Sequence, residues 1–358
     1  MVDIMGDYVT KIDELIQNIP EEILNLNATR KRGQVPTQAF SAFLTNREQG
    51  DWAEELIFRA INELEQDILA VKYGKSDQVV AGEPGFKEFY ESYQDELDTI
   101  GKRPDILIFK KNDFDSPNLD ISKMEVEECY KILSNAIAGL EIRSSSFLVG
   151  GYEEHVDNKK TRLIEEIDKL ITDLRPITRF LSKKWKIWLS NIDYDDLETF
   201  RGVPRISGRY PDDVKTKLKV LKTYLNELNK RNHLSFTPKV EDLLVIYKWI
   251  KTYGVPHYYI QVFFDKVYAI SFKNILEIIS NPDNNGKIFS IEKNAKNQFK
   301  NTIHIDINRG TVLAHKVDFP QHLSNIKRLG RGRLLFYISF EGGNAHLDVD
   351  NLYELLND

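Results

Sequence analysis

The first half of the chain combines helical hydrophobic spacing with short apolar runs. Residues 7–28 have helical spacing that Pro20 interrupts. From Asn46 to Leu69, apolar positions recur every three or four residues, which predicts a helix with one buried face. These positions are Trp52, Leu56, Ile57, Ile61 and Leu64. The run Ile106–Phe109 lies between polar segments and predicts a buried strand. The later string GLEIRSSSFLV predicts a second strand.

The second half begins with a change of texture near Gly150. Residues 156–190 and 211–231 have the spacing of amphipathic helices, and the loop RGVPRISGRYP joins them. HLSFTPKVEDLLVIYKWIKTYG then predicts a short strand and a helix. HYYIQVFFDKVYAISF predicts two adjacent strands with a turn at Asp265–Lys266. Residues 287–347 alternate apolar and polar positions, which indicates a β-rich C-terminal part.

This order of elements predicts an α/β fold in which a central mixed sheet is flanked by helices. We expect an N-terminal helical segment, a core in two pieces, a mostly helical insertion, and a β-rich C-terminal segment. The expected bounds are 1–45 for the first segment, 46–150 and 233–280 for the core, 151–232 for the insertion, and 281–358 for the last segment.

Composition narrows the class of protein without naming a function. The chain has 358 residues, of which 41% are hydrophobic, as in ordinary globular proteins. No apolar run approaches the roughly 20 residues of a membrane span, and the N-terminal residues do not resemble a signal peptide. A single cysteine, Cys129, excludes an internal disulfide and favours the cytoplasm. The net charge of −6 neither supports nor excludes nucleic-acid binding, because such binding needs only a local positive face.

Two carboxylates on the predicted strands suggest metal chemistry. Asp105 begins the first strand and Glu141 lies on the second, with Arg143 on the same side because strand side chains alternate. Mg²⁺ prefers oxygen ligands and uses one or two carboxylates while it keeps several waters. Asp105 and Glu141, with the backbone carbonyl of Ile142, are therefore candidate ligands for a metal that assists phosphodiester hydrolysis.

The same residues carry a family resemblance. RPDILIF and LEIRSS resemble the two halves of the PD-(D/E)XK nuclease signature, and Glu54 in GDWAEE resembles the helical glutamate that precedes it in many members. VPTQAFSAFLTNREQGDWAEE and GKRPDILIF resemble AccI-like type II restriction endonucleases. The resemblance covers roughly residues 35–150 and 233–275.

The resemblance implies an α/β PD-(D/E)XK core that hydrolyses double-stranded DNA with Mg²⁺ at a short palindromic or partly degenerate site and leaves 5′-phosphates. Asp105 and Glu141 would hold the metal, and Glu54 would orient water or a second ion. A homodimer and a cognate DNA methyltransferase are expected partners. Two alternatives stay open: a structure-selective or repair nuclease on the same core, and a catalytically silent DNA-binding protein.

One position departs from the signature, because Arg143 stands where lysine is usual. Arginine stays protonated and cannot act as a general base, but it binds phosphate through two parallel hydrogen bonds. We therefore assign Arg143 to the scissile phosphate. Lys239, just before the helix that follows the insertion, is a candidate for the missing lysine.

Each acidic candidate also has an ordinary structural interpretation. Asp105 could be a turn residue before a strand, and Glu141 could pair with Arg143 on an exposed strand face. Arg143 could then serve only that salt bridge. Glu54 could lie on a solvated helix face.

Several polar groups are candidates for DNA contact. Ser144 and Ser145 carry hydroxyls suited to phosphate oxygens. The helical insertion is a candidate for DNA recognition, because its flexible loop carries Arg201, Arg205 and Arg209. In KKWKIWL the lysines and tryptophans either contact DNA or form a helix that packs its tryptophans inward. A last basic cluster lies around two glycines: Lys327, Arg328, Arg331 and Arg333. The glycine patterns lack the features of an ATP-binding loop, and no zinc spacing is present.

Overall fold

The computed structural model describes residues 2–75, 79–194, 196–207, 209–230, 232–293 and 301–357. Contacts divide the chain into two compact units. The first, which we call the sheet unit, comprises Met1–Val149 and Leu234–Asp358. The second, the helical unit, comprises Gly150–His233.

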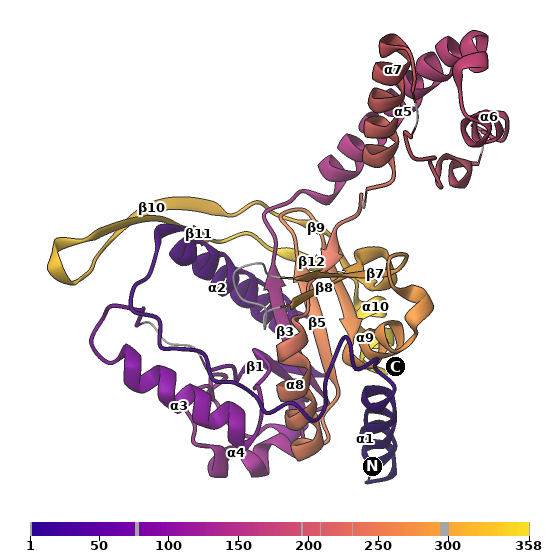
Figure 1. The fold of residues 1–358 in the computed structure, drawn as a ribbon. Coiled ribbons are helices and arrows are strands. Elements are labelled where there is room, and N and C mark those ends of the chain that lie inside the picture. The colour runs from indigo at the N-terminus through magenta and orange to yellow at the C-terminus, as the bar shows by residue number, and fades with distance from the viewer. Residues whose placement is uncertain are drawn as a thin grey trace. The chain divides into compact units, whose positions relative to one another are not determined.

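A seven-stranded mixed sheet forms the centre of the sheet unit (Figure 1). The strand order is β1-β2-β3-β5-β6-β9-β12. β3 and β5 run parallel, and the other neighbouring strands run antiparallel. The bounds are β1 (Ile68–Lys72), β2 (Ile106–Lys110), β3 (Ala138–Ser144), β5 (His257–Val262), β6 (Val267–Ser271), β9 (Thr311–Val317) and β12 (Ala345–Leu347).

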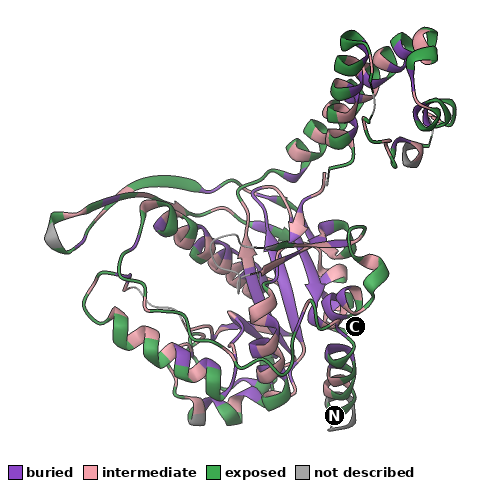
Figure 2. Ribbon diagram, viewed as in Figure 1, coloured by how far each residue is buried: buried purple, intermediate pink, exposed green. Residues whose placement is uncertain are grey.

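Helices cover both faces of this sheet, so its central strands β5 and β6 are wholly buried (Figure 2). α2 (Ser41–Asn62) and α10 (Val349–Asn357) share one core with Ile106, Leu140 and Tyr258. His257 and Tyr259 alternate with Tyr258 and therefore point to the opposite face. There, Trp249 of α8 (Val240–Tyr253) and Phe272 of α9 (Phe272–Ser280) contact the His257 ring. α1 (Val2–Gln17) packs on α8 and α9.

Several expected elements are confirmed, with shifted bounds. The predicted strand at 106–109 is β2, and the pair with a turn at Asp265–Lys266 is β5 and β6. The helix expected over 46–69 is α2, but it ends at Asn62. The chain then turns into β1, because Ile68 and Ala70 alternate into the same core as α2. The helix expected over 7–28 ends at Gln17, before Pro20.

The remaining elements of the sheet unit surround this core. α3 (Phe86–Thr99) and α4 (Val126–Leu133) lie between the first strands in sequence. The strands β8 (Asn301–Asp306) and β7 (Phe289–Lys293) of the C-terminal part form a three-stranded sheet with β4 (Ser235–Phe236). β10 (Gln321–Arg328) and β11 (Leu334–Glu341) form a long ribbon, and β11 contacts α2. Short 3-10 turns occupy Lys111–Asp113, Pro282–Asn284, Ile307–Arg309 and Gly330–Gly332.

The helical unit has a hydrophobic core of its own. It consists of α5 (Val149–Leu174, of which the first residue belongs to the sheet unit), α6 (Lys183–Ser190) and α7 (Asp212–Leu228), with 3-10 turns at Arg175–Phe180 and Leu197–Phe200. The helical character expected over 156–190 is confirmed, although it is divided: the turn containing Pro176 separates α5 from α6. Trp185 and Trp188 are 0% and 8% exposed, so the tryptophans of KKWKIWL pack inward, while Lys184 stays exposed and is not excluded from DNA contact by this packing. No helix in the described residues is long and apolar enough to cross a membrane.

Candidate active site

Two neighbouring strands bring Asp105 and Glu141 together. The Asp105 amide donates a hydrogen bond to the Leu140 carbonyl at 2.9 Å, where β2 begins beside β3. The Ile142 amide donates to Oδ2 of Asp105 at 2.6 Å. Asp105 is thus bonded to both chain neighbours of Glu141, and the two carboxylates interact electrostatically. Asp105 does stand at the turn before β2, as the structural interpretation expects. That interpretation does not explain why its carboxylate lies beside Glu141.

Gly74 allows a third segment to approach Asp105. The amides of Tyr73 and Gly74 both donate to the Asp105 carbonyl at 3.0 Å. A Cβ at Gly74 would lie 2.9 Å from the Asp105 Cα and 3.2 Å from its Oδ1. Only glycine fits at such a distance without a shift of the backbone. The Asp105 main chain is therefore fixed by β3 on one side and by the segment after β1 on the other.

Glu141 is buried, 1% exposed, and lies in a network of two cations and a second acid. Its Oε1 accepts from Nζ of Lys102 and lies 2.6 Å from Nη2 of Arg143. The same Arg143 nitrogen lies 3.2 Å from Oδ2 of Asp242, and Lys102 Nζ lies 3.8 Å from that oxygen. Glu141 and Arg143 thus form a salt bridge, but on a buried face, so the exposed-strand interpretation is wrong.

The three acids differ strongly in their charge state. Burial favours the neutral form of Glu141, but Lys102 and Arg143 outweigh it and lower the pKa of Glu141 to about 2. Burial and the Glu141 charge raise the pKa of Asp105 to about 7. Burial, followed by repulsion from Asp105, raises the pKa of Glu54 on α2 to about 9. Because Glu54 interacts electrostatically with both other acids, the solvated-face interpretation of this residue is not supported.

The donor set fits a hard divalent cation. Oε2 of Glu141 is buried and has no hydrogen-bond partner among the described residues. The Ile142 amide points to Asp105, and its carbonyl faces the same side because both groups of a strand residue point to one neighbouring strand. No group of three or more His, Cys, Asp or Glu side chains in the described ranges is arranged to hold a metal. Two carboxylates, one carbonyl and water match the ligand preference of Mg²⁺.

A cleft of about 580 Å³ opens beside these residues. Glu54 and Arg143 line it, together with Ser144, Ser145 and the first half of α2. Ser146 donates a hydrogen bond to the Gln49 side chain across it at 2.7 Å. The cleft therefore presents an arginine and several hydroxyls next to the carboxylates. Asp105 and Glu141 are not among its lining residues.

Lys102 and Asp242 are site residues that the sequence analysis missed. Lys102 precedes Asp105 by three residues within GKRPD, and its amide donates to the Val245 carbonyl of α8 at 2.9 Å. Gly101 permits this docking, since it has φ +90° and a Cβ there would lie 2.1 Å from that carbonyl. Asp242 belongs to the first turn of α8. In the sequence, the only indication of Lys102 was its position three residues before Asp105 in GKRPD.

The remaining candidates lie elsewhere. Lys239 is exposed at the start of α8, and none of the contacts of the described residues joins it to Glu141 or Arg143. Arg201, Arg205 and Arg209 are exposed in the helical unit. In the sheet unit, Lys327 pairs with Glu83, and Arg333 donates to Gln38 and stacks on Phe40, while the Arg331 side chain lies outside the described residues.

His257 is a buried core residue, as expected for a structural histidine. Its ring contacts Trp249, Tyr259 and Phe272. Burial lowers the pKa of His257 to about 4, so its ring is neutral near pH 7.

Comparison with known proteins identifies the family. The model of the AccI restriction endonuclease family matches residues 6–358, nearly the whole chain. Neither the curated proteins nor the solved structures gave a match. The family match includes the carboxylate cluster, the cleft and the helical unit. The chain belongs to the AccI restriction endonuclease family, and it is a site-specific deoxyribonuclease.

Proposed function

We propose that this type II restriction endonuclease hydrolyses double-stranded DNA with Mg²⁺ on a PD-(D/E)XK core. The observation that carries the proposal is the pairing of Asp105 with Glu141 across β2 and β3, next to an unpartnered buried carboxylate oxygen. An acid cluster whose pKa values diverge this far is typical of catalytic centres. The function follows from the family, and the chemistry is our inference from the site.

Asp105, Glu141 and the Ile142 carbonyl would hold the metal. Bound Mg²⁺ supplies Lewis-acid chemistry, which withdraws charge from the phosphate and makes water a better nucleophile. Glu54 lines the cleft and would accept a hydrogen bond from the attacking water. Its raised pKa reflects burial and repulsion from the other acids, and a bound cation would relieve that repulsion. The product would carry a 5′-phosphate and leave a 3′-hydroxyl.

Lys102 and Arg143 would bind the scissile phosphate. Both cations contact Glu141, and both also lie within ion-pair distance of Asp242. Burial disfavours the charged form of Lys102, but the charges of Glu141 and Asp242 outweigh it and raise its pKa. The charge of Glu141 also raises the pKa of Arg143, so both cations remain protonated and act as electrostatic groups rather than as bases. We therefore assign to Lys102 the place of the signature lysine. Ser144 and Ser145, on the cleft wall, would add hydrogen bonds to backbone phosphates.

The biological setting is also part of the proposal. A short palindromic or partly degenerate site is best cut by a symmetric pair of active sites, so we propose a homodimer on DNA. A cognate methyltransferase would protect the host sequence, and the single cysteine favours the cytoplasm.

The test is Asp105→Ala, with Asp115→Ala as a control. Asp115 is an exposed acid in the loop after β2 and is outside the cluster. We expect Asp105→Ala to bind DNA with an affinity near that of the wild type and to lose Mg²⁺-dependent cleavage by about 10³-fold or more, whereas the control cleaves normally. Cleavage by Asp105→Ala at the wild-type rate would remove Asp105 from the site and with it the proposed metal centre.

A further inference from the structure

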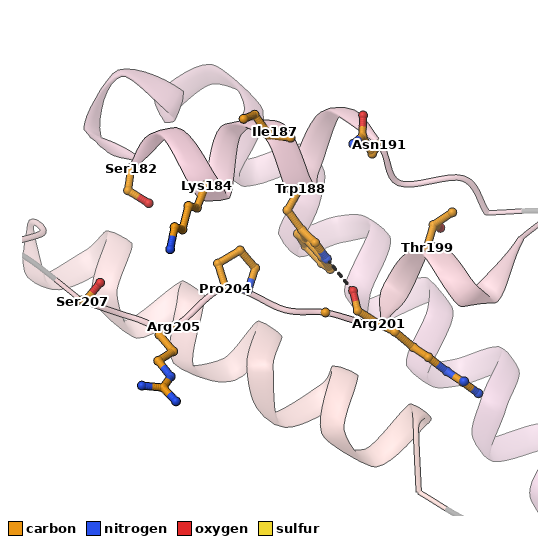
Figure 3. Close-up of a pocket in the computed structure, with 11 residues that line it drawn as sticks. Ser182, Lys184, Ile187, Trp188, Asn191, Thr199, Arg201, Pro204, Arg205 and Ser207 are labelled. Carbon is orange, nitrogen blue, oxygen red and sulfur yellow. Dashed lines mark hydrogen bonds between the residues drawn. The ribbon is translucent and has the colours of Figure 1, made fainter. Parts of the chain in front are cut away.

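The helical unit contains a cavity of about 810 Å³ between α6 and the loop 199–207 (Figure 3). Its lining includes the cations Lys184, Arg201 and Arg205. The lining also includes hydroxyl and amide side chains, those of Ser182, Thr199, Ser207 and Asn191. None of the described lining residues is Asp or Glu. The cavity is therefore suited to an anionic ligand.

The distribution of charge along the chain also favours an anionic ligand in this cavity. The helical unit has 18 Lys and Arg against 14 Asp and Glu, a formal charge of +4. The remaining residues have 31 against 41, a formal charge of −10. The positive excess thus belongs to the unit that holds the cavity, and the acid cluster belongs to the negative one. A local positive surface attracts nucleic acid even where the total charge is negative.

Two of the cavity cations are not committed to carboxylates. Several other lysines of the helical unit pair with acids, among them Lys169 with Glu166 and Lys217 with Asp173. Lys184 and Arg205 are exposed and have no ion-pair partner among the residues that the structure describes. Their charges are therefore available to a ligand.

The loop that carries two of the arginines is held in place by the core. Trp188 is 8% exposed, and its indole Nε1–H donates to the Arg201 carbonyl at 3.0 Å (Figure 3). Gly202 follows with φ +67°, a conformation that favours glycine. The cavity wall is thus built before a ligand arrives, which limits the entropy lost on binding.

The arrangement of the cations favours an extended ligand. In Figure 3 the Lys184 and Arg205 side chains lie at one end of the cavity, and Arg201 extends toward the other. Successive phosphates along a strand match charges at both ends better than one small anion does. Ile187, 50% exposed on the lining, offers apolar contact to a sugar or base edge.

We propose that this cavity binds the phosphodiester backbone of DNA as a second contact region, distinct from the carboxylate cluster. The proposal rests on the proposed function for its ligand class. It assigns to Lys184, Arg201 and Arg205 a role in affinity rather than in the cleavage step.

The experiment compares two double variants of the full chain. Lys184→Ala/Arg205→Ala removes two cavity cations, and Lys169→Ala/Lys217→Ala removes two paired lysines of the same unit. Affinity for a labelled mixed-sequence duplex is measured by fluorescence anisotropy in EDTA at several salt concentrations. Thermal unfolding confirms that both variants fold, and Lys184→Arg/Arg205→Lys tests rescue by conserved charge.

We expect the cavity variant to lose about 10-fold or more in affinity, and its salt dependence to become shallower by about 0.9 for each lost phosphate contact. The control should lose less than about 3-fold, and the conservative variant should bind like the wild type. Excess inorganic phosphate should compete weakly, since it cannot reach both ends. Equal losses in the two double variants, or none in the cavity variant, would overturn the proposal.

Cleavage measured in parallel separates this proposal from the proposed function. With Mg²⁺, the cavity variant should need about 10-fold or more DNA to reach half of its maximal cleavage rate, whereas the Lys169→Ala/Lys217→Ala control should cut like the wild type. If the cavity variant cleaved normally and kept its affinity, the cavity proposal would be refuted and the proposed nuclease function would stand. If the cavity variant lost affinity while the wild type itself did not cleave with Mg²⁺, the cavity proposal would stand and the proposed Mg²⁺-dependent cleavage would be refuted.

Discussion

At the scale of single residues, the candidate site is a set of neighbouring acids that differ strongly in charge state. Asp105 and Glu54 have raised pKa values because burial and neighbouring carboxylates disfavour their charged forms. Glu141 keeps its charge through Lys102 and Arg143. Functional sites commonly retain such destabilising arrangements because the ligand relieves them.

The raised pKa of Asp105 predicts a stability effect at this residue. Its folded pKa, about 7, exceeds an unfolded value near 4, so its favourable contribution is present below about pH 4 and is lost as pH rises to about 7. In the variant Asp105→Asn, the asparagine side chain would keep an acceptor for the Ile142 amide without the charge. In EDTA at pH 8, the melting temperature of this variant should therefore lie several degrees above that of the wild type. Each kcal/mol of added stability raises the melting temperature of a domain by about 2–4 °C.

Two further conditions control this prediction. The advantage of Asp105→Asn should shrink toward pH 4, where the wild-type carboxyl is protonated. Added Mg²⁺ should raise the melting temperature of the wild type more than that of the variant. An equal or lower melting temperature for Asp105→Asn in EDTA at pH 8 would show that Asp105 is not under electrostatic strain.

At the scale of elements, α8 determines which lysine enters the site. Gly101 lets the chain before β2 pack against the Val245 carbonyl, and this packing directs Lys102 to Glu141 and Asp242. Lys239 precedes α8 and is exposed. We therefore expect Lys102→Gln to reduce cleavage by about 10²-fold or more, as for loss of other charge-stabilising donors.

Lys239→Gln is the matched control, and it should cleave nearly like the wild type. Glutamine at position 102 keeps a hydrogen-bond donor for Glu141, which limits the damage from leaving a buried charge unpaired. Thermal unfolding in EDTA checks this. If Lys239→Gln lost activity while Lys102→Gln kept it, the two lysines would have to exchange roles.

Local pattern predicted most strands but few of the contacts that complete the site. The strands at 106–109 and 257–271 were predictable because apolar residues fill them, and Asp105 and Glu141 follow from those strands. Lys102 and Asp242 are polar residues in a turn and a first helical turn, where such residues are ordinary. Their partners lie 39 residues away for Lys102–Glu141 and 99 for Arg143–Asp242, so only tertiary packing reveals them.

At the scale of the whole molecule, our proposals place the cleavage step in one unit and a further DNA-contact region in the other. The sheet unit holds the acid cluster, and the helical unit carries the positive excess. Because carboxylates repel the phosphates of DNA, we propose that the basic helical unit supplies part of the affinity for DNA. The family match spans both units, consistent with one enzyme that needs both.

The most direct test of the account is incubation of the purified full chain with plasmid DNA in Mg²⁺ or in EDTA, followed by end sequencing. We predict discrete fragments in Mg²⁺ alone, which share one short sequence at their ends and carry 5′-phosphates. Cleavage in EDTA would contradict the metal-centre proposal. Fragments with unrelated ends would indicate a structure-selective or repair nuclease, and binding without cleavage under any divalent metal would indicate a silent DNA-binding protein.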